Sequence, residues 1–100
     1  MPAVSLKGKM STGHGGFPPT PMTDTPVKKT KFNGIFPGVV DPNCKFAAHS
    51  LGTTVHPEDI RYPSAGASKT YIEGKKAARI GDSLNDGDAI AEGSSNSFIE

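Results

Sequence analysis

Apolar residues along this chain occur in short groups that glycine and proline interrupt. The 100 residues include 12 glycines and 9 prolines. No amphipathic pattern with helical spacing therefore continues beyond about two turns. Short stretches suited to β-strands remain between the turns. The pattern predicts a mostly β, loop-rich chain without long helices.

Several of these stretches repeat. Residues 30–34 (Thr-Lys-Phe-Asn-Gly) match residues 70–74 (Thr-Tyr-Ile-Glu-Gly), and a third copy begins at residues 97–100 (Ser-Phe-Ile-Glu). A second echo relates residues 2–9 to residues 76–82. The glycines that close the first two copies permit tight turns, so we expect hairpins. Repeats this short cannot each bury a core, so we expect them to pack around a shared axis as a compact pseudo-symmetric unit.

Length and charge narrow the class of protein. One hundred residues suit a single domain, which we place at residues 1–100. The formal net charge is +1, and the lysines are scattered apart from residues 28–31 and 75–76, so we expect no nucleic-acid partner. No stretch approaches a membrane span, and the start lacks the basic and apolar segments of a signal peptide. We expect synthesis and folding in the cytoplasm.

All three histidines, His14, His49 and His56, and the single cysteine, Cys44, can be combined into one metal site. A lone cysteine forms no internal disulfide, whereas one thiolate and three imidazoles are a closed structural zinc set. Four residues separate Cys44 from His49 and six separate His49 from His56, spacings that a loop can fold around a metal. Structural zinc contributes about 10–16 kcal/mol in small domains whose stability is only about 5–15 kcal/mol. We therefore predict a zinc-stabilised fold.

Short motifs follow one another along nearly the whole chain. They are Pro2-Ala3-Val4-Ser5, Thr12-Gly13-His14-Gly15 with Phe17-Pro18-Pro19, Tyr71-Ile72-Glu73-Gly74 leading into Ala77-Ala78-Arg79-Ile80-Gly81-Asp82, and Gly93-Ser94-Ser95-Asn96-Ser97-Phe98-Ile99. Together they resemble the PAAR-repeat proteins, which cap the spike of type VI secretion systems and contractile phage tails. Three positions depart from the family pattern. Lys76 stands where the name-giving motif has proline, and Gly16 and the pair Asn85-Asp86 stand where cysteines are common.

The resemblance implies a small β cone with pseudo-three-fold repeats. Its broad base would sit on the blunt end of a trimeric β-helical spike, and a zinc site would lie near its sharp vertex. In that family three histidines and one cysteine usually hold the metal. The positions that match here are His14, Cys44, His49 and His56.

The implied function is structural rather than enzymatic. A monomer would bind one copy per trimer to a VgrG-type or phage central spike protein and sharpen it for membrane piercing. It would contact the target-cell membrane transiently, leave the cell with the spike and be able to attach effector cargo. We expect the hairpins around Phe32, Tyr71 and Phe98 to form the docking base.

A catalytic zinc is the alternative. His56-Pro57-Glu58 matches the His-x-Glu half of a zinc deaminase signature, but no Pro-Cys-x-x-Cys follows. Four protein ligands also leave no position for the water that a hydrolytic zinc needs. If one histidine did not bind, Glu58 would be the natural general base of a small zinc hydrolase.

The acidic segment 82–88 resembles part of a calcium loop. Leu84 occupies a position that needs an oxygen ligand, and Gly93 stands where the closing glutamate belongs. We therefore predict a turn between Ile80 and Ile90, with left-handed residues at 85–87.

Overall fold

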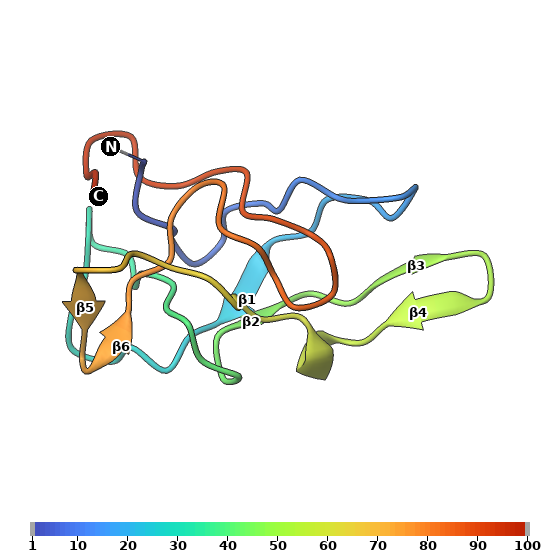
Figure 1. Cartoon of the computed structure of the whole chain (residues 1–100), viewed down its shortest axis with the longest axis horizontal. Helices are drawn as coiled ribbons and strands as arrows, with labels where there is room; N and C mark the ends of the chain where they lie inside the picture. The colour runs from blue at the N-terminus through green and yellow to red at the C-terminus, as the bar shows by residue number, and fades with distance from the viewer. Residues whose placement is uncertain (1, 100) are drawn as a thin grey trace.

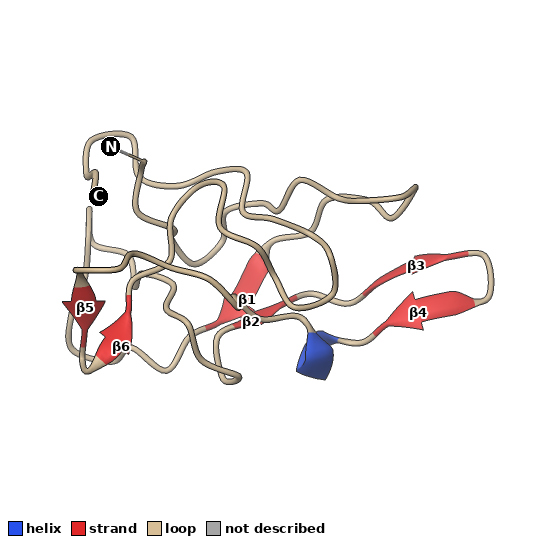
Figure 2. Ribbon diagram, viewed as in Figure 1, coloured by secondary structure: helices blue, strands red, loops and turns tan. Residues whose placement is uncertain are grey.

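Antiparallel pairs of two or three residues form all of the named strands in the computed structural model, which describes residues 2–99 (Figures 1 and 2). The elements are β1 (Met22–Asp24), β2 (Lys45–Phe46), β3 (His49–Leu51), β4 (Thr54–His56), the 3-10 turn η1 (Glu58–Ile60), β5 (Tyr71–Ile72) and β6 (Lys75–Lys76). β1 pairs with β2, β3 with β4 and β5 with β6. The prediction of a mostly β, loop-rich domain is confirmed.

The two repeated stretches form matching hairpin turns. Asn33 and Gly34 have φ angles of 55° and 77°, and Glu73 and Gly74 have φ angles of 51° and 83°. Two successive positive φ angles are the signature of the tight hairpin turn that suits twisted strands. The third copy pairs at its start, since Phe98 bridges Ala3, but its last residue lies outside the described residues.

A closed cycle of three backbone hydrogen bonds joins three segments of the chain, those around Ser5, Gly38 and Ala78. The Ser5 N–H donates to the Ala78 carbonyl (3.0 Å), the Ala78 N–H to the Gly38 carbonyl (3.0 Å), and the Gly38 N–H to the Ser5 carbonyl (2.9 Å). The flanking bridges are Val4 with Arg79, Leu6 with Pro37, and Val39 with Ala77. A Cβ on Gly38 would lie 2.9 Å from Ser5 Oγ, so the cycle needs small residues. The three segments, residues 4–6, 37–39 and 77–79, therefore surround a common axis.

Three further hairpins, at residues 9–22, 45–62 and 82–90, continue along this axis; we call them the apical hairpins. The first pairs with the second through Met22 and Phe46, and the second pairs with the third through Pro63, just beyond its end, and Leu84. Ser11 and Ile90 join the third to the first. Each apical hairpin thus touches both of the others.

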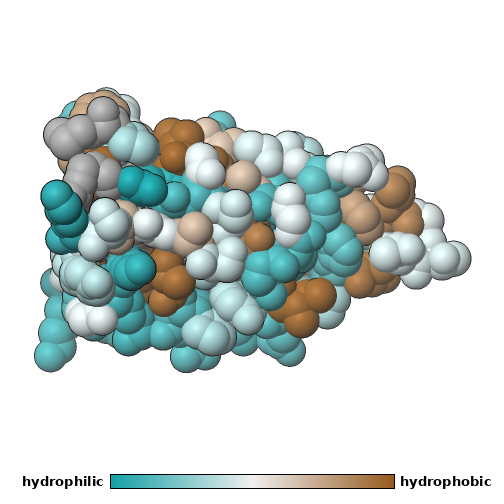
Figure 3. All heavy atoms as spheres, viewed as in Figure 1, coloured by the Kyte–Doolittle hydropathy of each residue, from teal (hydrophilic) through white to brown (hydrophobic). Residues whose placement is uncertain are grey.

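The molecule tapers along its longest axis, with extents of 37 × 24 × 22 Å. Its broad end carries both termini and the β5–β6 hairpin, and its narrow end is formed by the β3–β4 hairpin (Figures 1 and 3). The apolar core lies between the ends and includes Met22, Val27, Val39, Cys44, Phe46, Ile72, Leu84 and Ile90. Among residues 2–99, no helix is long and apolar enough to cross a lipid bilayer.

Glu73 ties the broad end together across the chain. Its carboxylate accepts hydrogen bonds from the backbone N–H groups of Lys28 (3.3 Å), Lys29 (3.1 Å) and Thr30 (3.1 Å). Partial desolvation raises the pKa of Glu73, but the hydrogen bonds from Lys29, Lys28 and Thr30 outweigh it and hold the pKa below the ordinary 4.5. The ionised carboxylate therefore anchors residues 28–30 to the β5–β6 turn.

We predict that Glu73→Gln lowers the melting temperature at pH 7, because a neutral amide is a weaker acceptor for three N–H groups. A depressed folded-state pKa means that the wild-type advantage exists above pH 4.5 and is lost as the pH falls through that lower pKa. Melting curves of both proteins between pH 3 and pH 7, about the range that spans a carboxylate titration, test this. A difference that does not change with pH would contradict the charged anchor.

Candidate metal centre

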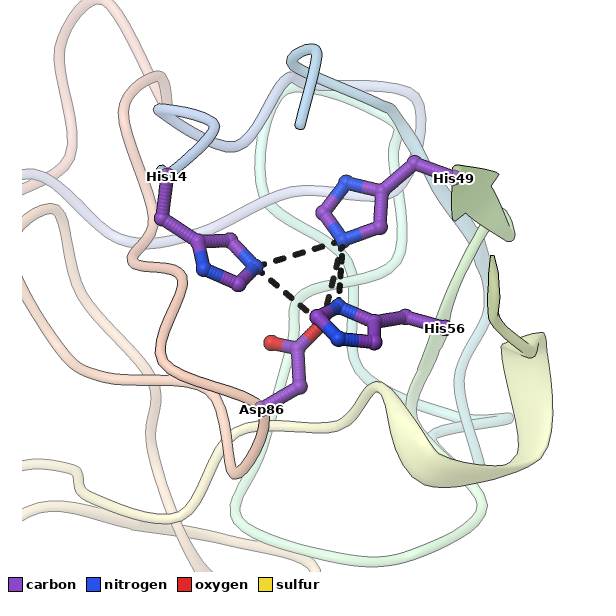
Figure 4. Close-up of side chains that lie close together, drawn as sticks. All are labelled: His14, His49, His56 and Asp86. Carbon is purple, nitrogen blue, oxygen red and sulfur yellow. Dashed lines mark hydrogen bonds and ion pairs between the residues drawn. The ribbon is translucent and has the colours of Figure 1, made fainter. Parts of the chain in front are cut away.

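Three histidines and one aspartate converge near the narrow end, one or two from each apical hairpin (Figure 4). His14 comes from the first, His49 and His56 from the second, and Asp86 from the third. His49 begins β3 and His56 ends β4, and these two residues are direct partners in the antiparallel register. Such partners place their side chains on the same face, so one short hairpin supplies two donors.

The distances between the donor atoms match the edges of a tetrahedron around zinc. His49 Nε2 lies 3.3 Å from His14 Nε2 and 3.0 Å from His56 Nδ1. Asp86 Oδ2 lies 3.2 Å from His49 Nε2, 3.2 Å from His56 Nδ1 and 3.7 Å from His14 Nε2. With ligands about 2.0–2.1 Å from zinc, the edge of a regular tetrahedron is about 3.3 Å. The four donors are therefore spaced to hold one ion.

The hydrogen bonding of His49 supports a cation at the centre. Its Nδ1 lies 3.0 Å from the Pro18 carbonyl oxygen, which can only accept, so Nδ1 carries the hydrogen. In the neutral imidazole, Nε2 then presents a lone pair to the nearby nitrogens and to Asp86 Oδ2. Two acceptors, His49 Nε2 and Asp86 Oδ2, then lie 3.2 Å apart and repel each other, whereas a divalent cation between them attracts both. A carbonyl on the distal nitrogen is also the usual way in which proteins orient a metal-binding histidine.

Cys44, the fourth ligand that the sequence predicted, lies apart from this group. Its side chain is fully buried in the apolar core, and its Sγ lies 3.7 Å from Met22 Sδ. Burial raises the pKa of Cys44 to about 11, so the thiol stays protonated, although metal ligation requires the thiolate. The available signal was position: Cys44 directly precedes β2 and lies two residues before Phe46, which is also buried.

Asp86 is the donor that the sequence analysis did not select. It lies in the predicted turn, which is confirmed between Ile80 and Ile90, although within residues 85–87 only Gly87 has a positive φ, of 98°. A Cβ on Gly87 would lie 3.4 Å from His14 Nδ1, so this turn packs closely against the first apical hairpin. The available signal was the alignment of Asn85-Asp86 with a common cysteine position.

The Arg61 guanidinium, also missed, joins the three apical hairpins beneath the donors. Arg61 is fully buried; its Nε lies 2.8 Å from Asp86 Oδ2 and its Nη2 lies 2.5 Å from Asp88 Oδ2. Its Nη1 donates to Thr20 Oγ1 and to the Ala47 carbonyl. One cation against two carboxylates leaves one negative charge, which suits an adjacent metal ion.

Arg61 also keeps Asp86 ionised. Burial raises the pKa of the Asp86 carboxyl, but the hydrogen bond from Arg61, the N–H of Asp88 and the charge of Arg61 together hold that pKa below its ordinary value. At neutral pH the carboxylate is therefore available as a metal ligand.

The Phe17 ring covers the three imidazoles. Its centre lies 4.0 Å from that of His56 and 5.0 Å from that of His14, with nearly parallel planes, and 4.7 Å from that of His49. The His49 side chain has no exposed surface, and those of His14 and His56 are about one-fifth exposed (22% and 20%). Phe17 and Arg61 thus restrict the access of water, as in a closed structural site.

Glu58, the general base of the hydrolase alternative, is engaged elsewhere. Its Oε2 accepts a 2.6 Å hydrogen bond from Thr23 Oγ1, and Glu58 does not belong to the group of donors. The part of the chain that the structure describes contains no pocket beside the donors. The arrangement is suited to holding an ion with four protein atoms.

No protein-family model matches the chain, and no curated protein sequence matches it either. The geometry of residues 2–99 therefore carries the functional argument together with the motifs.

We predict that a strong chelator lowers the melting temperature of the zinc-loaded chain, because a ligand that binds only the folded state stabilises it by about 4 kcal/mol at 1,000 times its Kd. His49→Ala should melt at the temperature of the chelated wild type, with or without zinc. Melting curves combined with metal analysis by mass spectrometry test this. An unchanged melting temperature after verified metal removal would show that the ion does not stabilise the fold.

Arg61→Met should destabilise the zinc-loaded chain by about 3–5 kcal/mol, because it leaves buried carboxylates without their cation. The matched control is Lys45→Met, which breaks the more exposed 3.1 Å ion pair with Asp59 and should cost less than about 1 kcal/mol. Urea unfolding in excess zinc measures both. Equal effects of the two substitutions would rule out a special role for the buried cation.

Proposed function

We propose that the chain is a PAAR-like spike tip, a conical zinc-stabilised domain that caps the trimeric spike of a contractile injection machine. The observation that supports this proposal most strongly is the closed cycle of hydrogen bonds among Ser5, Gly38 and Ala78. A single chain on a three-fold axis gains three similar contacts only if its own surface repeats about every third of a turn. The cycle supports an approximate three-fold axis of this kind.

The broad end offers aromatic side chains suited to such docking. In the aligned repeats, Lys31, Tyr71 and Phe98 occupy equivalent positions. Tyr71 is 57% exposed and Phe98 is 51% exposed, while Lys31 Nζ lies 5.0 Å from the ring centre of Phe36. Exposed aromatic residues are typical anchors of protein interfaces. Ile35, in the turn that follows Lys31, is also exposed.

The narrow end has the properties needed to enter a membrane. Residues 10–23 and 46–57 contain no Lys, Arg, Asp or Glu, and Leu51 and Val55 of the β3–β4 hairpin are exposed. A charged side chain costs about 2.5–3.5 kcal/mol at the centre of a bilayer, so an uncharged apex lowers the resistance to penetration. A metal ion held by three hairpins would stiffen this end, where few residues can pack.

The proposed partner is a VgrG-type or phage central spike protein, bound as one chain per trimer. The chain could also carry effector cargo, and the assembled tip would leave the cell with the spike. The same docking geometry serves a secretion apparatus and a phage tail.

The test is binding of the purified chain to a trimeric VgrG-type or phage central spike protein. We expect one chain per trimer by native mass spectrometry. Tyr71→Asp and Phe98→Asp should each weaken binding at least about tenfold, as loss of an interface anchor does. Val55→Asp, at the opposite end, is the control and should bind normally. Three chains per trimer, or equal binding by all variants, would overturn the proposal.

A further inference from the structure

We propose that Asp86, and not Cys44, completes the metal site, so that three imidazole nitrogens and one carboxylate oxygen bind the ion. This inference rests on the proposed zinc site but not on the docking of the chain to a spike. It replaces the three-histidine, one-cysteine set that the sequence motifs imply.

The Asp86 carboxylate is held so that one oxygen faces the imidazoles. Its Oδ1 accepts a 3.2 Å hydrogen bond from the Asp88 N–H, whereas Oδ2 faces the three histidines and accepts from Arg61 Nε. Because both oxygens are restrained, the carboxylate presents a single donor atom. The side chain is only 2% exposed, so its position is fixed by protein contacts rather than by solvent.

Cys44, in contrast, is held in the apolar core, away from the histidines. It has no exposed surface, and it belongs to the same buried cluster as Met22, Val39 and Phe46. To reach the histidines, its side chain would have to leave this cluster and open a cavity in the core. The thiol therefore acts as a small apolar residue.

The donor set determines which ions the site favours. Imidazole and carboxylate ligands in tetrahedral spacing suit Zn²⁺ and Co²⁺, whereas a thiolate would add preference for soft ions such as Cu(I). Co²⁺ is a useful probe because its absorption spectrum reports both the tetrahedral geometry and the presence of a thiolate ligand.

The experiment is titration of the metal-free chain with Co²⁺, followed by competition with Zn²⁺. We expect the wild type and Cys44→Ala to bind one Co²⁺ with equal affinity and with no thiolate-to-cobalt charge-transfer band. Asp86→Ala should bind more than tenfold more weakly. Asp59→Ala, which removes an exposed carboxylate, is the matched control and should bind as the wild type does.

A variant that gains a new absorption band distinguishes a change of metal ligand from a simple failure to fold. Asp86→Cys in the Cys44→Ala background should bind Co²⁺ and acquire the charge-transfer band, since the new thiol stands where the oxygen was. A band in the wild type that Cys44→Ala removes would overturn the inference and leave the zinc site itself intact. A wild type that binds neither Co²⁺ nor Zn²⁺ would overturn both, without bearing on whether the chain caps a trimer.

Discussion

The buried contact between Arg61 and the carboxylates of Asp86 and Asp88 is the interaction on which the narrow half of the molecule depends. Arg61 lies on the second apical hairpin, both carboxylates lie on the third, and the Thr20 hydroxyl brings in the first. None of these hairpins has an apolar interior of its own. Their relative placement therefore comes from backbone pairing, from the apolar residues Met22, Phe46, Leu84 and Ile90 that they share in one core, and from the contacts of Arg61. The spacing of the four candidate donors follows from that placement.

Contacts between distant segments also hold the rest of the molecule together, with different chemistry. Near the middle, Ser5, Gly38 and Ala78 close a cycle through backbone groups alone, which is feasible because their side chains are small. At the broad end, hydrogen bonds to the Glu73 carboxylate join residues 28–30 to the β5–β6 turn.

The conformation of the turns could be predicted from the sequence, but which distant side chains meet in the fold could not. The hairpin turns at residues 30–34 and 70–74 follow from Gly34 and Gly74, whose backbone conformation is a local property. The three histidines were selected from the sequence as candidate ligands, and the structure brings their ring nitrogens together. The choice between Cys44 and Asp86 depends on which side chain the packed core retains, and a buried arginine such as Arg61 has no sequence signature.

The narrow end has to be stable although it offers little room for an apolar core. In the proposed spike tip, so narrow an end has too little volume for an apolar core of its own, and exposed charges would oppose entry into a bilayer. Between residues 46 and 57 the chain carries no formal charge, and its stabilising polar groups, Arg61 and Asp86, are supplied by flanking turns and are buried. Coordination by His14, His49 and His56 would then replace hydrophobic packing with a few strong directional bonds. The polar groups Arg61 and Asp86 are thus enclosed, while residues 46–57 add no charged side chain to this end.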